Sequence, residues 1–379
     1  MNEYRYWVHR IPHIGDATIY KLLNEYGDEQ KIYKACCDKD EHILRMITGK
    51  KDNEEIKADV IQYAKNSKID RDFAVLKEKG ISFTTVFDED YPLRLKNIDR
   101  PPYALYYIGD LPKDDVPSVA IIGARNCTEY GTFIANAFGT ALAKEGINII
   151  SGMAIGVDGI AQRAALNTGG ITYAILGSGV DICYPEANVR LYNAIKESGG
   201  IISTFPPGTT PQKRFFPERN RIVAGLSDLV LVVEARLKSG TGITVELALK
   251  MGKDVYAVPG RITDRLSDGC NMLIRQGAGI ALSPEDIIRE LSELWGRNHP
   301  DSDKLNQNLI TKMDLWRPTK DDGILKYLDA YPKSIDEIHA LRLKDEPNTP
   351  LPVTLSELVL KCLDGAVVQV GASYFYKAL

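Results

Sequence analysis

The sequence predicts an α/β protein with an extended Rossmann-like, mostly parallel sheet, an N-terminal helical module and a C-terminal winged-helix domain. Seven apolar, β-rich runs between residues 118 and 295 alternate with helix-period segments, a pattern typical of parallel strands covered on both faces. Residues 1–75 show helical periodicity alone. Residues 321–379 combine helices with two short strands about a glycine, which favours a winged helix.

The helical module, residues 1–75, contains the segment IPHIGDATIYKLLNEYG at 11–27. This segment looks like a helix-hairpin-helix or SAM-like unit, whose turn presents backbone N–H groups to a phosphate. His13 stands where such a turn normally begins with glycine, so DNA contact and a packing role both stay open. Residues 76–117 are expected to form a connector, because RPPY and LPKDDVP interrupt their extended pieces.

The Rossmann-like domain is expected over residues 118–295. Its predicted strands are VAIIG (119–123), INIISG (147–152), ITYAILG (171–177), GIISTF (200–205), LVLVVEA (229–235), DVYAVPG (254–260) and GIALS (279–283). Its predicted helices lie near 129–144, 157–168, 188–198, 217–226, 242–251, 270–276 and 285–293. The polar stretch 296–320 is predicted to be a linker. In the winged-helix domain, residues 354–363 offer Lys361 alone as a basic group, which favours protein contact over groove recognition.

Composition limits the class of protein. A chain of 379 residues fits about two or three domains. The net charge of −4 argues against a uniformly basic nucleic-acid coat and leaves room for a local basic groove. Six cysteines without a CxxC pair predict reduced thiols rather than disulfides or a zinc knuckle. No apolar run is long enough to cross a bilayer and the polar start lacks a signal-peptide core, so we expect a cytoplasmic protein without a membrane partner.

The expected ligand site is the carboxyl edge of the sheet, where open parallel sheets usually bind their ligands. Glycine there lets a ligand approach backbone N–H groups, and arginine offers a forked donor to phosphate. The first strand and the helix start at Thr128 or Glu129 are typical of a strand that delivers a phosphate to a helix N-terminus. The candidate residues after the strands are Arg125, Gly177, Ser178, Gly179, Lys213, Arg214, Phe216, Arg219, Asn220, Arg221, Ser239 and Gly240.

Catalytic and cofactor signatures are missing from the sequence. Neither the dinucleotide fingerprint G-x-G-x-x-G nor the P-loop pattern occurs after a predicted strand. The α/β domain has no histidine, which removes His-based triads and the usual metal centres there. We therefore expect a binding protein with no catalytic residues, no cofactor and no metal. The histidines are His9, His13, His42, His299 and His339.

Six blocks of the sequence carry a family resemblance. They are GAR…YG at 123–131, ISGMAIGVDGIAQRAAL at 150–166, LGSGVDICYPEAN at 176–188, FPERNRIVAGLSD at 216–228, VVEARLKSGTGIT at 232–244 and VYAVPG…DGCNMLIRQGA at 255–278. Together they resemble the DNA-processing protein A family (DprA, also called Smf). The resemblance implies a cytoplasmic homodimer, formed through the Rossmann-like domain, that binds and protects single-stranded DNA and loads RecA on it. Such a protein is a mediator of natural transformation and recombination, not a known enzyme.

The resemblance also implies a DNA pocket. It would use Arg125 of the G-x-R motif, the turn Gly177–Gly179, and Phe216, Arg219, Asn220 and Arg221 of the F-P-x-R-N-R segment. Backbone amides and arginine forks would hold phosphates while an aromatic ring stacks a base, so binding would tolerate any sequence. This chain departs from the usual family residues at Ala124, Gln162, Thr204 and Glu218. Ala124 and Glu218 bear on the strength of the phosphate contacts.

Two alternatives from other classes stay open. SGTGITVE at 239–246 loosely echoes the PGGxGTxxE signature of lysine-decarboxylase-like nucleotide phosphoribohydrolases. In that hypothesis Arg125 would hold the phosphate and Glu246 would assist cleavage of the N-glycosidic bond. The other alternative is a dinucleotide-binding regulator with a winged-helix output, against which the missing fingerprint argues.

Overall fold

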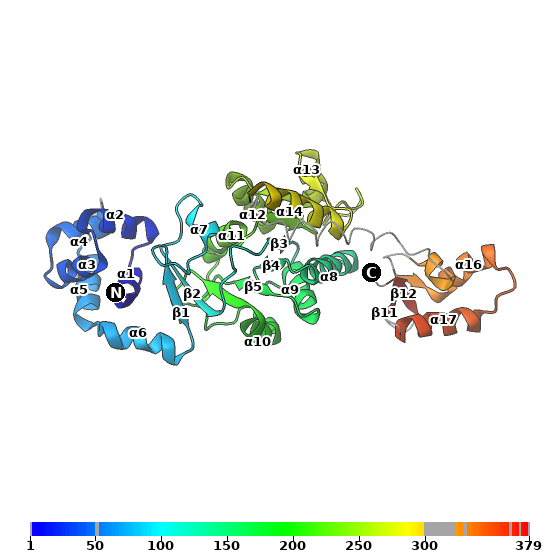
Figure 1. The fold of residues 1–379 in the computed structure, drawn as a ribbon, viewed down its shortest axis with the longest axis horizontal. Coiled ribbons are helices and arrows are strands. Elements are labelled where there is room, and N and C mark those ends of the chain that lie inside the picture. The colour runs from blue at the N-terminus through cyan, green and yellow to red at the C-terminus, as the bar shows by residue number, and fades with distance from the viewer. Residues whose placement is uncertain are drawn as a thin grey trace.

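The structure is a computed structural model that describes residues 2–49, 53–298, 323–328, 332–363, 366–370 and 373–377 (Figure 1). The first part of the described chain forms helices only. They are α1 (Asn2–His9), α2 (Asp16–Tyr26), α3 (Glu29–Cys37), α4 (Glu41–Thr48), α5 (Glu54–Asn66) and α6 (Ile69–Glu78). Their apolar faces share one core around Trp7, Leu22 and Ile32, as the helical periodicity of this region predicts.

The central sheet has nine strands. They are β1 (Ser82–Thr85), β2 (Ala104–Gly109), β3 (Ser118–Ile122), β4 (Asn148–Ser151), β5 (Thr172–Ile175), β6 (Gly200–Ser203), β7 (Leu229–Val232), β8 (Asp254–Ala257) and β9 (Gly279–Ile280). Their order is β1-β2-β6-β5-β4-β3-β7-β8-β9. The seven predicted strands, β3 to β9, pair in parallel. β1 and β2, from the predicted connector, extend the sheet by antiparallel pairing against β6. The α/β, Rossmann-like class is confirmed.

Helices cover both faces of the sheet (Figure 1). One layer holds α8 (Glu129–Lys144), α9 (Val157–Asn167), α10 (Val189–Ser198) and α14 (Pro284–Asn298). The other holds α7 (Leu93–Lys96), α11 (Phe215–Leu226), α12 (Gly240–Lys250) and α13 (Asp268–Arg275). Neighbouring residues of β3 serve different layers, since Val119 and Ile121 contact the first layer and Ala120 and Ile122 the second. This two-sided burial explains why the strand sequences are continuously apolar.

The chain order of the strands reverses at the centre of the sheet. From β3 the chain proceeds through β4 and β5 to β6 on one side, and β7, β8 and β9 continue on the other side. The carboxyl ends of β3 and β7 therefore flank the topological switch point, where open α/β sheets bind their ligands.

The last part of the described chain forms a separate small core around Ile324, Ile338, Leu358 and Phe375. Its elements are η3 (Gly323–Tyr327), β10 (Lys333–Ser334), α16 (Ile335–Asp345), α17 (Leu351–Leu363), β11 (Val367–Val370) and β12 (Tyr374–Lys377). The strands form an antiparallel sheet in the order β10-β12-β11. Most of the predicted linker 296–320 lies outside the described residues, and its first residues belong to α14.

Candidate nucleic-acid interface

The side chain of Glu234 fills the switch point. Glu234 follows β7, is 2 % exposed, and accepts hydrogen bonds from the backbone N–H (2.9 Å) and the hydroxyl (2.5 Å) of Thr128. Thr128 is the N-cap of α8, so the positive end of this helix already faces an internal anion. A Cβ on Gly131 would overlap the same carboxylate. The prediction that this loop brings a phosphate to the α8 N-terminus is therefore wrong, and the site that a dinucleotide regulator needs is occupied.

Arg125 lies beside this crevice with its side chain exposed. Its guanidinium carbon is 5.7 Å from the centroid of the Phe216 ring. The Tyr184 ring, 42 % exposed, comes from the loop after β5 and is tilted by 38° against the Phe216 ring of α11, with 5.7 Å between the ring centroids. We call Arg125, Phe216 and Tyr184 the first stack. Tyr184 lies in the block 176–188 but is not among the predicted site residues. Its place after the Gly-rich turn is the sequence signal that indicates it.

A second group of basic and aromatic side chains lies on the segment that leads from β6 into α11. The guanidinium carbon of Arg214 is 5.0 Å from the Phe215 ring centroid, and the Phe215 and Phe205 rings are 4.2 Å apart. Lys213 and Arg214 are exposed. We call Arg214, Phe215 and Phe205 the second stack. Cations beside exposed aromatic rings are typical of surfaces that bind single-stranded nucleic acid, since phosphates and unpaired bases alternate along it.

The turn Gly177–Gly179, which the family resemblance places in the DNA pocket, is buried. The Phe216 ring lies against Gly177, where a Cβ would come within 3.1 Å of a ring carbon. The Ser178 hydroxyl donates to the carbonyl oxygen of Ile182 at 3.0 Å, and the Gly179 N–H donates to that of Thr209 at 2.8 Å. The turn therefore supports the first stack from beneath.

Arg219 points into the protein, which contradicts the prediction that it contacts DNA directly. The residue is 6 % exposed, and its Nη1 donates to the carbonyl oxygen of Ile175 at 2.9 Å. Asp158, itself 8 % exposed, lies with Arg219 against Gly152, near enough for the two charges to attract each other. Burial lowers the pKa of Arg219 and raises that of Asp158, and the attraction between the two charges opposes both shifts.

Arg221 faces a different part of the molecule. Its Nη1 donates to the backbone carbonyl oxygens of Arg100 and, at 3.3 Å, of Asp99. Successive residues of a helix point about 100° apart, so the R-N-R motif cannot present all its side chains to one ligand. Asn220, between the two arginines, is half-buried. The structure thus brings Arg125 and Phe216 together and does not bring Arg221 to them.

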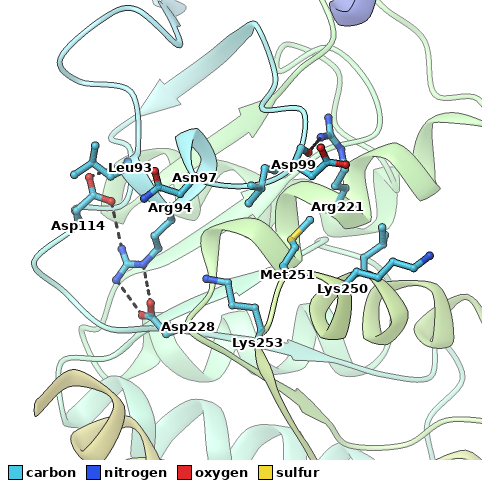
Figure 2. Close-up of a pocket in the computed structure, with 12 residues that line it drawn as sticks. Leu93, Arg94, Asn97, Asp99, Asp114, Arg221, Asp228, Lys250, Met251 and Lys253 are labelled. Atoms are coloured by element: carbon cyan, nitrogen blue, oxygen red, sulfur yellow. Dashed lines mark hydrogen bonds and ion pairs between the residues drawn. The ribbon is translucent and has the colours of Figure 1, made fainter. Parts of the chain in front are cut away.

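Arg221 lines a cavity of about 820 Å³, which Figure 2 shows. Asp228 and Lys253 directly precede β7 and β8, so the cavity lies at the amino ends of these strands, opposite the Arg125 edge. Its Arg94 is already bound: Nε and Nη2 each donate to the Asp228 carboxylate at 2.9 Å. Burial lowers the pKa of Lys253. These paired charges join the 76–117 segment to the sheet and do not form a free basic groove.

Ser239 and Gly240 lie at the start of α12. Ser239 lines a cavity of about 350 Å³ between α12 and α13, together with Leu249 and Met272. No described side-chain atom caps this helix N-terminus. Arg236 and Lys238, exposed in the preceding loop, give the region a basic character.

Comparison with known proteins decides the family. The profile described as DNA recombination-mediator protein A matches residues 82–292, which contain all nine strands of the central sheet. The chain belongs to the DNA recombination-mediator protein A family. The predicted family resemblance is confirmed, and the chain is placed among the DNA recombination mediators.

Its relatives cover most of the chain. The DNA processing protein DprA of Streptococcus pneumoniae is 42 % identical over 213 residues, which are 56 % of this chain and 75 % of that protein. Protein Smf of Escherichia coli is 33 % identical over 290 residues, 76 % of this chain and 75 % of that protein.

Two solved structures of the family are also similar. The X-ray structure of S. pneumoniae DprA gives a TM-score of 0.64 at 33 % identity and covers 76 % of this chain and 98 % of that one. DprA of Helicobacter pylori, studied for its single-stranded DNA binding mode, gives a TM-score of 0.51 at 35 % identity and covers 56 % of this chain and 96 % of that one.

Within this family fold, the residue of the phosphoribohydrolase alternative has an unsuitable environment. Glu246 is exposed and its carboxylate is 2.6 Å from Lys250 Nζ, an ion pair that lowers the pKa of Glu246. A carboxyl that donates a proton to a leaving base needs a raised pKa instead. The described residues contain no cluster of three or more potential metal-ligating side chains. Nor does any helix among them combine the length and the apolar character needed to span a bilayer.

Proposed function

We propose that this recombination mediator binds single-stranded DNA along the carboxyl edge of its sheet, with the first stack as its main contact. The observation that carries the proposal is the exposed Arg125 guanidinium beside the Phe216 ring. A cation that can contact a phosphate and an aromatic ring that can stack a base are thus close enough to bind the same nucleotide. The single-stranded DNA binding mode of the H. pylori relative supports the same activity here.

The second stack would hold the neighbouring nucleotides. Lys213 and Arg214 offer exposed cations next to the Phe215 and Phe205 rings. Gly177, Ser178 and Gly179 would act by supporting Phe216, and Asn220 would lie under the same surface. Ser239 and Gly240, beside the exposed Arg236 and Lys238, would flank it. Binding through stacking and phosphate contacts would tolerate any sequence and favour single strands over duplex.

The test is fluorescence anisotropy with a labelled oligothymidine and its duplex counterpart over a range of salt concentrations. We expect tighter binding of the single strand. Arg125→Ala should weaken this binding and lower its salt slope by about 0.7, the value for one lost phosphate contact on a single strand. Arg289→Ala, which removes an exposed arginine of α14, is the matched control and should change neither quantity. Equal binding by wild type and Arg125→Ala, or no binding by either, would contradict the proposal.

We further propose that the bound strand is protected and delivered to RecA, as the family resemblance implies, during natural transformation and recombination. Contact through stacked rings and phosphates keeps the strand unpaired, which RecA assembly requires. The chain should speed RecA filament formation on an oligonucleotide, and Arg125→Ala should not. Because a recombination mediator acts on the chromosome, we propose that it works in the cytoplasm.

We also propose that the chain forms a homodimer through the Rossmann-like domain. Leu237, Leu249, Ile280 and Leu282 are 61 %, 59 %, 48 % and 71 % exposed around the α12–α13 cavity and the edge strand β9. Apolar side chains gathered at an open sheet edge favour association. Leu249→Glu should reduce the molar mass measured by light scattering from dimer to monomer, and an unchanged mass would place the dimer surface elsewhere.

For the remaining parts of the chain we propose a helical module over 1–75, a connector over 76–117, a Rossmann-like domain over 118–295, a linker over 296–320 and a winged helix over 321–379. Two helices followed by the β11–β12 hairpin support the winged helix. Leu355, Val359 and Leu360 of α17 are exposed, which favours a protein partner over a DNA groove.

A further inference from the structure

A buried polar cluster lies directly beneath the first stack. It joins the end of β4, the start of α9, the end of β5 and the first turns of α11. Arg219 donates from Nη1 to the carbonyl oxygen of Ile175, the last residue of β5, at 2.9 Å. Asp158, on α9, accepts from the N–H of Gly152, the residue after β4, at 3.1 Å. Both side chains are buried, and both lie against Gly152.

Gly152 gives this cluster its space. A Cβ at position 152 would overlap the guanidinium of Arg219, because the arginine lies directly against the glycine Cα. Alanine at this position would therefore displace the guanidinium without removing a charge. This close approach is the reason for a glycine here, since its backbone is not in the left-handed region.

Phe216 and Arg219 are three residues apart and so share one face of α11. Phe216 on this face contacts Gly177, and Arg219 donates a hydrogen bond to the carbonyl oxygen of Ile175, two residues before Gly177 at the end of β5. One helix face is thus attached to one loop at two points. Rotation of α11 or movement of the loop would change the tilt of the Phe216 ring relative to Arg125.

Stability alone does not account for an arginine at this position. Taking a guanidinium and a carboxylate out of water costs free energy that their attraction often fails to return. Nε of Arg219 is also buried without an acceptor among the described residues. An apolar side chain would fill the space at lower cost, but it could not hold the Ile175 carbonyl at a defined distance.

We infer that Arg219 is a positioning residue: held beside Asp158 at Gly152, it fixes the Ile175–Gly177 backbone under Phe216 and so orients this ring to stack a base. The inference rests on the proposed binding of single-stranded DNA. It differs from a direct phosphate contact by Arg219 in a measurable way, because losing a phosphate contact changes the salt slope and losing a stacked base does not.

The experiment uses the full chain as wild type, Arg219→Met and Gly152→Ala, and measures affinity for an oligothymidine and for an abasic strand of equal length. Both variants should lose about 5- to 150-fold in affinity for oligothymidine, which corresponds to about 1–3 kcal/mol for one stacked base. The preference for oligothymidine over the abasic strand should fall by the same factor, and the salt slope should stay at the wild-type value. A slope lowered by about 0.7 in Arg219→Met, with the preference intact, would instead show a phosphate contact and overturn the inference.

Folding and the proposed function are controlled separately. Asp158→Asn combined with Arg219→Met removes both buried charges and keeps an acceptor for the Gly152 N–H, so it provides a folded variant if Arg219→Met alone does not fold. In the protein without DNA, amide hydrogen exchange should increase at residues 175–179 and 215–219 in each variant. Unchanged exchange there would overturn the inference, whereas failure of the wild type to bind DNA would overturn the proposed function alone.

Discussion

Removal of the Glu234 carboxylate should destabilise the sheet domain and open an anion site at the start of α8. Glu234→Ala removes a charged acceptor from the Thr128 N–H, a hydrogen bond of a kind that contributes about 1.5–3 kcal/mol. It also removes a negative charge from the positive end of α8, for a further loss of about 0.3–1 kcal/mol. The free energy of unfolding should therefore fall by about 2–4 kcal/mol.

The assay is thermal unfolding followed by circular dichroism. For a domain of this size the loss corresponds to a melting temperature lowered by about 4–16 °C. Glu129→Ala is the matched control: it removes an exposed carboxylate that the helix dipole stabilises in the first turn of α8, and should lower the melting temperature by about 1–4 °C. Inorganic phosphate should then stabilise Glu234→Ala more than the wild type, because the N-terminus of α8 is free to bind an anion.

Two results would refute this reasoning. If Glu234→Ala has the same melting temperature as the wild type, the hydrogen bonds of this carboxylate to Thr128 do not stabilise the start of α8 as calculated. If phosphate stabilises the wild type as much as the variant, the N-terminus of α8 binds anions with Glu234 in place. The prediction of a phosphate site at the start of α8 would then hold.

Three further predictions concern other residues. Arg221→Ala should lower the free energy of unfolding by about 1.5–3 kcal/mol, since it removes charged hydrogen bonds to two carbonyls. It should leave the salt slope of DNA binding unchanged, whereas Arg214→Ala should lower that slope by about 0.7. His9 is half-buried, and loss of hydration, with the nearby charge of Arg10, lowers its pKa to about 4. The folded state therefore stays neutral while the unfolded state gains a proton, so stability should be full above pH 6.5 and fall by about 3 kcal/mol between pH 6.5 and 4. Urea unfolding should no longer show this loss for His9→Gln. Neither the wild type nor Glu246→Gln should release free base from a nucleoside monophosphate in a chromatographic assay, and release by the wild type alone would revive the phosphoribohydrolase alternative.

Local patterns were enough to predict most of the secondary structure. The helix expected at 129–144 agrees with α8 at both ends, because Thr128 is an N-cap residue and its hydroxyl accepts from the Gly131 N–H. The seven β-rich runs became β3 to β9 because such strands need little beyond apolar side chains on both faces. The sheet membership of β1 and β2 was not predicted, since it depends on antiparallel pairing of β2 with β6, which is distant in sequence, and of β1 with β2.

The sequence predicts which residue types form the candidate site and at which edge of the sheet they lie, but not which way their side chains point. The Gly and Arg residues that follow the parallel strands lie at the carboxyl edge of the sheet, because the strand ends of a parallel sheet share one side by geometry; that DNA binds there stays a prediction. Whether an arginine faces solvent depends on which side of its helix is buried, and this is set by contacts with elements far along the chain. Arg219 therefore proved internal, Arg221 turned toward residues 99–100, and Tyr184 joined Phe216 from another loop. Glu234 filled the crevice for the same reason: its partner Thr128 precedes it by more than a hundred residues, and nothing local to either residue indicates that they meet.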